Sequence, residues 1–205
     1  MKTDTPLMQR VLGEDWHELP AAIRSHYDIT APGKSTTVTG SMTIDYPAWL
    51  SPALKLLRLG NALIDMKGGP MTVQVKKWQD DDGSALCWHR DIQAGDGRRR
   101  LFPSRMVRHQ DHELIEYVGM GFGIRLKVGV EDGRLVYRSN GHLLKLGIIT
   151  LPIPDSLLLG RAVISEEALS EGSFLLRFEI VHPLWGKTYS YGGIFKTTAA
   201  PDRTD

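Results

Sequence analysis

Residues 84–107 read SALCWHRDIQAGDGRRRLFPSRMV, and this stretch decides the fold. Apolar and polar side chains alternate from Leu86 to Ile92, a pattern typical of a half-buried β-strand. A second strand-like run, residues 98–107, follows the turn residues Gly95-Asp96-Gly97. Because Gly and Asp in a short loop favour hairpin turns, the stretch predicts two antiparallel strands.

The same pattern extends in both directions from this hairpin. Short turn signals such as Asp132-Gly133 separate the runs. The expected strands cover residues 37–44, 71–78, 84–92, 98–107, 113–118, 123–131, 134–139, 143–150, 161–168, 173–182 and 187–197. Many short strands joined by short turns form antiparallel meanders. We therefore predict an α+β, mainly β fold: a curved antiparallel sheet or an up-and-down barrel of about ten strands.

Helix signals stand before the strands and once between them. Pro6 and Pro20 each suit the first turn of a short N-terminal helix. One longer helix is expected over residues 52–66, inserted after the first strand. Its apolar positions, among them Leu57 and Ile64, occupy most of the circumference. A helix that is so broadly apolar is expected to be covered on more than one side, here by the sheet.

Length, charge and cysteine content set further bounds. The chain of 205 residues, 41% of them hydrophobic, predicts a single β-rich domain over residues 1–198 and a disordered tail over residues 199–205. A formal net charge of +1 gives no field that would attract nucleic acid, so we expect no nucleic-acid partner. The one cysteine excludes an internal disulfide and agrees with a reducing compartment. Without a signal-type N-terminus or an apolar run of about 18 residues, we expect a cytoplasmic location and no transmembrane segment.

Motifs for metals and cofactors are missing from the sequence. The seven histidines show no metal-ligand spacing, and no phosphate loop or dinucleotide fingerprint is present. We therefore expect no metal and no cofactor. The basic run Arg98-Arg99-Arg100 is interpreted as a solvated hairpin edge rather than an anion site, because Asp91 and Asp96 stand nearby.

Polar residues stand in phase with apolar ones on several predicted strands. Arg90 shares a strand face with Trp88, and Glu116 shares one with Leu114. If these faces turn inward, the two charges enter an apolar interior where they must be paired, so we expect Arg90 to pair with Glu116. The predicted ligand-binding residues are the polar and aromatic members of such faces: Trp88, Arg90, Phe102, Ser104, Glu116, Phe178, His182 and Tyr191. The alternative is a structural ion pair that fixes the register of the sheet.

A set of single residues and short motifs carries a family resemblance. It comprises Trp88-His89-Arg90-Asp91, Phe102-x-Ser104, Glu116, Asp132-Gly133-x-Leu135, Gly147, Leu151-Pro152, Gly172-x-Phe174, His182-Pro183-Leu184-x-Gly186 and Tyr191-x-Gly193. On this set, residues 7–197 resemble the bacterial family called domain of unknown function 4166. In some members of that family, the domain follows a dehydrogenase-like dinucleotide-binding domain or accompanies membrane segments. The resemblance carries over no catalytic residue, but it implies a separate oxidoreductase as a candidate partner.

Three functions agree with these observations. The first hypothesis is a binding module that holds a small apolar or amphipathic ligand, such as a lipid, in a cavity of the sheet. The second is an enzyme, or an accessory domain of an oxidoreductase, in which Glu116 or His182 serves as acid or base. The third is an interaction domain without a cavity. A cavity lined by Arg90 and Glu116 would favour the first two over the third.

Overall fold

The computed structural model describes residues 5–30, 34–59, 63–170 and 172–198. The predicted disordered tail, residues 199–205, lies outside the described residues. Two short helices precede the first strand, as the sequence predicts: α1 (Leu7–Leu12) and α2 (Ala21–Arg24), with a 3₁₀ turn between them. A third helix, α3 (Ser51–Leu59), follows the first strand.

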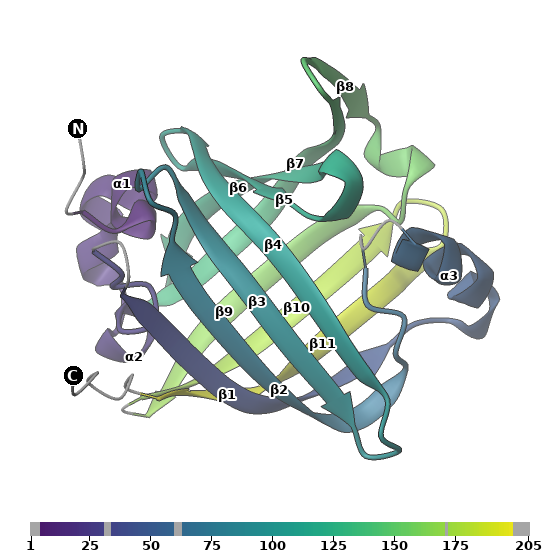
Figure 1. Ribbon diagram of the computed structural model, residues 1–205, viewed down its shortest axis with the longest axis horizontal. Helices are drawn as coiled ribbons and strands as arrows, with labels where there is room; N and C mark the ends of the chain where they lie inside the picture. The colour runs from purple at the N-terminus through teal and green to yellow at the C-terminus, as the bar shows by residue number, and fades with distance from the viewer. Residues whose placement is uncertain (1–4, 31–33, 60–62, 171, 199–205) are drawn as a thin grey trace.

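The strands form one antiparallel sheet (Figure 1). They are β1 (Ser35–Asp45), β2 (Gly68–Gln79), β3 (Ala85–Ala94), β4 (Arg99–Gln110), β5 (Glu113–Tyr117), β6 (Phe122–Glu131), β7 (Arg134–Leu146), β8 (Ile149–Ile153), β9 (Arg161–Ser170), β10 (Ser173–His182) and β11 (Gly186–Thr198). Neighbours in sequence pair with each other almost throughout, as in an up-and-down meander.

Two pairings close the sheet on itself. β1 pairs with β11 and β6 pairs with β7, so the described strands make a closed ten-stranded antiparallel barrel. β8 stands outside this ring, since within the described residues it pairs with β7 alone. Closure confirms the barrel alternative of the predicted fold. It also leaves the ring with no unpaired edge along which another chain could add a strand.

The strand predicted over residues 143–150 does not exist as a separate element. β7 runs without interruption to Leu146, and the chain then turns back into β8. A β-bulge explains the difference, because Asn140 and Gly141 together stand opposite the single residue Arg125 of β6. Gly141 has a φ of 105°, which few other residues adopt. The break expected between residues 139 and 143 is therefore a bulge inside one strand and not a turn between two.

The predicted helix over residues 52–66 is too long. α3 ends at Leu59, and residues 63–66 are not helical. Two backbone carbonyls of that segment accept hydrogen bonds from tyrosine hydroxyls. Tyr189 donates to the Ile64 carbonyl oxygen at 2.8 Å, and Tyr46 donates to the Asp65 carbonyl oxygen at 2.9 Å. Ile64 is buried beneath this contact. The predicted helix is therefore helical up to Leu59 and not helical over residues 63–66.

The short helices lie at opposite ends of the barrel (Figure 1). α1 and α2 cover one end, where α1 contacts β4 and β6 and α2 contacts β9 and β10. The side chains of Leu7, Met8, Val11 and Leu12 are buried there and belong to the main hydrophobic core. α3 lies at the other end (Figure 1). The N-terminal segment thus closes one end of the barrel.

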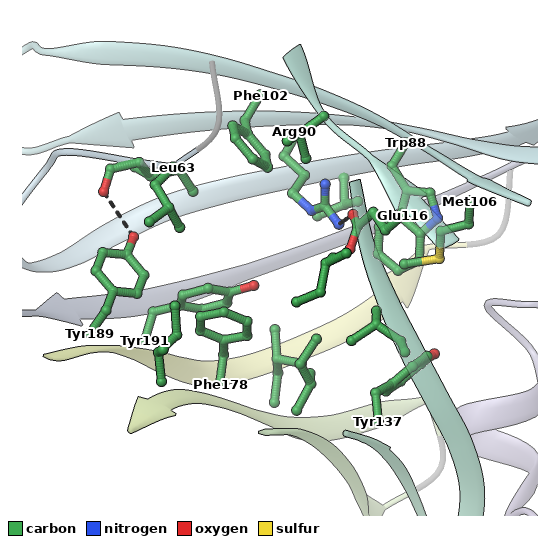
Figure 2. Close-up of a pocket in the computed structure, with 18 of the residues that line it drawn as sticks. Leu63, Trp88, Arg90, Phe102, Met106, Glu116, Tyr137, Phe178, Tyr189 and Tyr191 are labelled. Carbon is green, nitrogen blue, oxygen red and sulfur yellow. Dashed lines mark hydrogen bonds and ion pairs between the residues drawn. The ribbon is translucent and has the colours of Figure 1, made fainter. Parts of the chain in front are cut away.

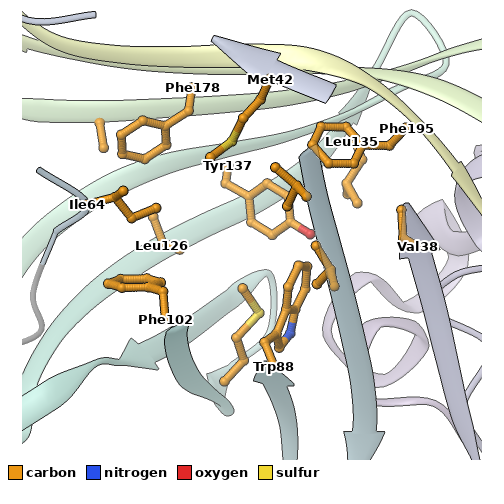
Figure 3. Close-up of a cluster of buried hydrophobic side chains, with 14 of the residues drawn as sticks. Val38, Met42, Ile64, Trp88, Phe102, Leu126, Leu135, Tyr137, Phe178 and Phe195 are labelled. Atoms are coloured by element: carbon orange, nitrogen blue, oxygen red, sulfur yellow. The ribbon is translucent and has the colours of Figure 1, made fainter. Parts of the chain in front are cut away.

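Apolar side chains enter the interior of the barrel from all sides. Inward-facing residues of different strands, such as Val38, Leu126, Leu135 and Phe195, meet in one buried cluster (Figure 3). Alternation along each strand places apolar residues inside and polar residues outside. This packing supplies most of the favourable free energy of folding, since apolar burial is the dominant favourable contribution.

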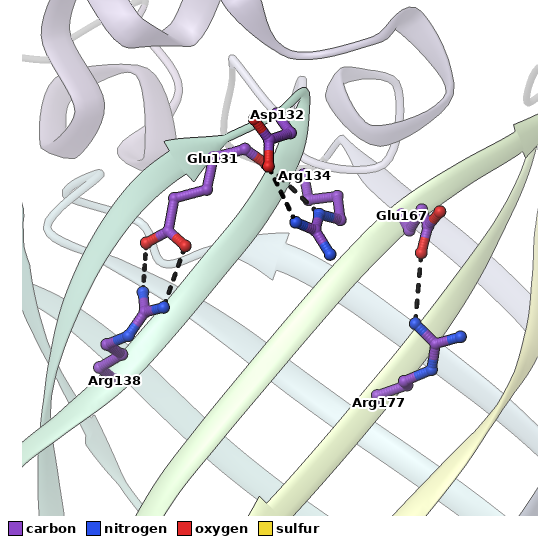
Figure 4. A network of polar contacts seen from close by, with 6 residues as sticks. All are labelled: Glu131, Asp132, Arg134, Arg138, Glu167 and Arg177. Carbon is purple, nitrogen blue, oxygen red and sulfur yellow. Dashed lines mark hydrogen bonds and ion pairs between the residues drawn. The ribbon is translucent and has the colours of Figure 1, made fainter.

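The outer face carries ion pairs between neighbouring strands and within hairpins. Arg138 pairs with Glu131, and Arg177 of β10 pairs with Glu167 of β9 at 3.2 Å (Figure 4). In the predicted basic run, Arg99 pairs with Asp91 at 2.5 Å. β4 is not an edge strand, however, because β3 and β5 flank it. Arg98 and Arg99 are exposed and pair with acids of their own hairpin, whereas Arg100 is in phase with Phe102 and donates to the Arg58 carbonyl oxygen of α3 at 3.1 Å.

Candidate functional site

A cavity of about 180 Å³ lies inside the barrel. Its wall includes Tyr27 from the N-terminal segment, Leu57 from α3, Leu63 and Ile64, and residues from most of the strands (Figure 2). Most lining residues are apolar or aromatic, and only a few polar side chains join them. Pockets with apolar walls and a few polar groups are the usual form of a small-molecule site.

Arg90 is the centre of the polar part of the wall. Its Nη1 donates to Ser104 Oγ at 2.7 Å, and its Nη2 donates to Glu116 Oε1 at 2.9 Å (Figure 2). The three residues come from the neighbouring strands β3, β4 and β5. Each stands at an inward-facing position of its strand, so the three side chains meet inside the barrel. The predicted pairing of Arg90 with Glu116 is therefore present. We call Arg90, Ser104 and Glu116 the arginine cluster.

Aromatic rings surround the arginine cluster. The Arg90 guanidinium carbon lies 4.6 Å from the ring centroid of Trp88 and 5.5 Å from that of Phe102. Across the cavity, the rings of Phe178 and Tyr191 stack with centroids 4.6 Å apart. Burial raises the pKa of Tyr191 to about 12, so its hydroxyl keeps its proton. Among the described residues that hydroxyl has no hydrogen-bond partner, which leaves it able to bind a ligand.

The structure brings most of the predicted site residues together. Trp88, Arg90, Phe102, Glu116, Phe178 and Tyr191 line the cavity. Ser104 is buried behind Arg90 and is not part of the lining. Their role in ligand binding remains a prediction.

His182 does not face the cavity. Its Nδ1 accepts the Leu184 backbone N–H at 3.1 Å, its Nε2 lies 3.2 Å from the Ser156 carbonyl oxygen, and its ring stacks on Trp185. His182 is buried and keeps the inward phase of β10, but it is the last residue of that strand. At this position its side chain contacts Ser156 and Trp185 and not the cavity. His182 is thus not among the residues that line the cavity, and its predicted role in ligand binding stays a prediction.

A second polar cluster, which the sequence analysis missed, stands at the end covered by the N-terminal helices. Lys77 Nζ lies 2.5 Å from His26 Nδ1, and His26 Nε2 lies 3.3 Å from Glu166 Oε2. Tyr27 donates to Glu166 Oε1 at 2.8 Å, and the Tyr27 and Tyr137 hydroxyl oxygens are 2.7 Å apart. We call these five residues the lysine cluster.

Burial dominates the electrostatics of the lysine cluster. It lowers the pKa of Lys77 to about 7 and that of His26 to about 4. Burial by itself would raise the pKa of Glu166, but His26, Lys77 and Tyr27 together outweigh it and hold that pKa below its ordinary value. The pKa of Tyr137 is raised well above its ordinary value by burial. Glu166 is therefore the anion of the cluster, and His26 is its neutral centre.

Part of this cluster left a signal in the sequence. Lys77 is in phase with Val73 and Val75 on β2, and Glu166 is in phase with Ile164 on β9. Both are charges on otherwise apolar faces, the same pattern that revealed Arg90. His26 gave no such signal, because it follows the short helix α2 and belongs to no strand.

The described part of the chain shows neither a metal centre nor a membrane-spanning helix. There, no group of three or more His, Cys, Asp or Glu side chains is arranged to hold a metal ion. None of the helices in those residues is both long and apolar enough to span a bilayer.

Comparison with known protein families places the chain. A family model described as "Domain of unknown function (DUF4166)" matches residues 19–195, from the end of the N-terminal 3₁₀ turn to the last barrel strand. No curated protein matches the chain. The matched region holds all the residues of both clusters.

Proposed function

The chain belongs to the DUF4166 family, and from that premise we propose that its barrel binds a small apolar or amphipathic, lipid-like molecule in the interior cavity. The observation that carries the proposal is the cavity itself: an apolar space of about 180 Å³ with the arginine cluster in its wall. A closed barrel of this size can hold one small ligand. Apolar walls supply affinity, and the few polar groups fix orientation.

The charge balance of the cavity favours a ligand with a neutral polar end. Glu116 already neutralises Arg90, and Glu166 is the counter-charge of Lys77. An ionised ligand would bring an unpaired charge into this space, and such burial is costly. A hydroxyl or carbonyl group can instead use the Tyr191 hydroxyl or an edge of the guanidinium. We therefore infer an alcohol, aldehyde or ketone with an apolar body.

The end of the barrel near α3 offers a way in. Trp49, just before α3, packs against Trp185 with ring centroids 5.5 Å apart. The two side chains remain 55% and 53% exposed. Leu57 of α3 and Leu63 line the cavity beside this end and are only partly buried. Apolar surface at the rim of an apolar cavity suits the passage of a poorly soluble ligand.

A matched pair of variants tests the proposal. Ile164 lines the cavity, whereas its neighbour Val163 points outward and is 41% exposed. We expect Ile164→Trp to fill the cavity and weaken the binding of octanol at least about tenfold, since a tenfold loss of affinity is only 1.4 kcal/mol. Displacement of a polarity-sensitive fluorophore from the protein measures the octanol affinity. Val163→Trp should bind octanol as the natural protein does.

Folding of both variants is checked by thermal unfolding, because overpacking a core costs about 1–3 kcal/mol. Failure of the natural protein to bind octanol saturably, or equal binding by both variants, would overturn the proposal.

The other two hypotheses receive less support. The interaction domain without a cavity loses its premise, because the described residues enclose one. The enzyme hypothesis rested on Glu116 or His182. Glu116 is held in an ion pair with Arg90, and both ring nitrogens of His182 contact backbone groups outside the cavity. A separate oxidoreductase as partner remains a prediction.

A further inference from the structure

The amine of Lys77 is set in an apolar wall of the cavity. Lys77 lies inward on β2, directly opposite Trp88 of β3, and is 2% exposed. Its Nζ stands 4.0 Å from the ring centroid of Trp88 and 4.2 Å from that of Tyr27. All three residues line the cavity. A lysine amine is thus placed where a bound apolar molecule can reach it and bulk water is largely excluded.

Behind this amine stands a chain of two further groups. His26 Nδ1 is 2.5 Å from Lys77 Nζ, and His26 Nε2 is 3.3 Å from Glu166 Oε2. Because Nδ1 faces a donor and Nε2 faces a carboxylate, this arrangement assigns the ring proton to Nε2. Stacking on Phe174, with centroids 4.3 Å apart, holds the ring in place. The order amine, imidazole, carboxylate is that of an activated nucleophile with an oriented base.

The protonation states agree with such a role. Since burial lowers the pKa of Lys77 to about 7, a large share of its amine is uncharged at neutral pH and has a free lone pair. The lowered pKa of His26 keeps its ring neutral, with Nδ1 able to accept a proton. An ordinary surface lysine, with a pKa near 10.4, has very little free amine under the same conditions.

We propose that Lys77 is a carbonyl-reactive amine that forms an imine with an apolar aldehyde or ketone bound in the cavity. This inference rests on the proposed function, because the cavity must first hold the molecule. The Nζ lone pair attacks the carbonyl carbon, a C–N bond forms, and the carbonyl π electrons move to oxygen. His26 Nδ1 takes a proton from nitrogen and returns it to the oxygen. The second nitrogen proton then moves to the same oxygen. The C–O bond breaks, the nitrogen electron pair forms the C=N bond, and water leaves, so that amine plus carbonyl have become imine plus water.

Octanal and sodium cyanoborohydride test the proposal on the full chain. The reductant converts an imine into a stable secondary amine, so each reacted lysine gains one octyl group that mass spectrometry detects. Peptide mapping of the natural protein at neutral pH then compares Lys77 with its neighbour Lys76, which is exposed on the outer face of the same strand. We expect Lys77 to be labelled at least about tenfold faster than Lys76, because more of its amine is free.

Two variants serve as controls. Lys77→Met should remove the fast-labelled site, and Lys76→Met should leave it unchanged. The comparison within the natural protein does not depend on whether Lys77→Met folds. Equal or slower labelling of Lys77 than of Lys76 would overturn the inference.

Octanol separates this inference from the proposed function, because it has the same chain but cannot form an imine. If octanol and octanal both displace the fluorophore and Lys77 is not labelled, the imine is wrong and the binding function stands. If neither molecule displaces it and no label reaches Lys77, both proposals fall together.

Discussion

Arg90 and Glu116 are charged residues that face an apolar interior, with side chains only 14% and 10% exposed. Leaving one of two buried partners alone is strongly destabilising, since the remaining charge has lost both water and its counter-ion. Glu116→Leu should therefore lower the free energy of unfolding by about 3–5 kcal/mol. The double variant Arg90→Met with Glu116→Leu should lose much less. Urea unfolding of both variants measures the difference, and equal losses would show that the pair is not coupled.

The same double variant separates anchoring from structure. If the arginine cluster orients a ligand, the folded double variant should bind octanol at least about tenfold more weakly, as expected for one lost hydrogen bond. Unchanged octanol affinity would mean that the pair only fixes the register of the sheet.

His26 predicts a loss of stability in mild acid. Its pKa is lowered to about 4 in the folded protein, whereas an unfolded histidine titrates near pH 6.5. Between these pH values His26 is protonated in the unfolded state but not in the folded state. The free energy of unfolding therefore falls as the pH drops from 6.5 towards 4, by roughly 3 kcal/mol in all. His26→Gln should lose less stability than the natural protein between pH 7 and pH 5. His17→Gln, at an exposed position, should behave like the natural protein, and identical pH profiles for all three proteins would refute this account.

Strand phase was enough to predict the pairing of Arg90 with Glu116, because each stands two positions from a buried apolar residue of its own strand, Trp88 and Leu114. His182 was misplaced because phase predicts the face of a strand but not the position along the barrel. At the last position of β10, an inward side chain meets Ser156 and Trp185 instead of the cavity. The lysine cluster was missed because its centre, His26, reaches Lys77 across 51 residues of sequence from a loop without periodicity. Phase along one strand cannot reveal a contact of that kind.

At the scale of elements, Leu57 of α3 is less buried than Ile64 of the segment that follows it. Ile64 is 4% exposed and belongs to the core, whereas Leu57 is only partly buried and lines the cavity. The expected burial against the sheet is therefore complete for Ile64 and only partial for Leu57. A helix over residues 52–66 would have placed Leu57 and Ile64 two turns apart on one face. Residues 63–66 are not helical, so that relation does not hold.

This difference predicts unequal costs for two similar substitutions. Ile64→Ala should lower the free energy of unfolding by about 2–5 kcal/mol, as core truncations do. Leu57→Ala should cost about 1 kcal/mol or less, because little of its surface leaves a packed environment. Thermal and urea unfolding give both values. A cost for Leu57→Ala as large as that for Ile64→Ala would place α3 firmly in the core.

Turns and strands were predicted well where Gly and Asp mark tight hairpins, as at Gly95-Asp96-Gly97. Asn140-Gly141 carries a similar signal and yet lies within β7. Both turns and bulges use a glycine with positive φ, so the sequence alone does not separate them.

At the scale of the whole molecule, closure decides what the protein can do. A curved open sheet and a barrel have the same strands and the same alternation, and the sequence left that choice open. The pairings of β1 with β11 and of β6 with β7 close the ring and turn one face of every strand into the wall of a cavity. Residues 7 to 30 then close one end. The cavity is therefore a property of the assembled ring and not of any single segment.

The indole N–H signals of the tryptophans test the central claim, that this cavity binds a small apolar ligand, most directly. The chain has five tryptophans. Trp88 lines the cavity, and its Nε1 has no hydrogen-bond partner among the described residues, whereas Trp78 does not line the cavity. In a ¹H–¹⁵N NMR titration with octanol, we predict a saturable shift of the Trp88 signal and no shift of the Trp78 signal. A Trp88 signal that stays in place at saturating octanol, or five signals that drift together without saturation, would contradict the account.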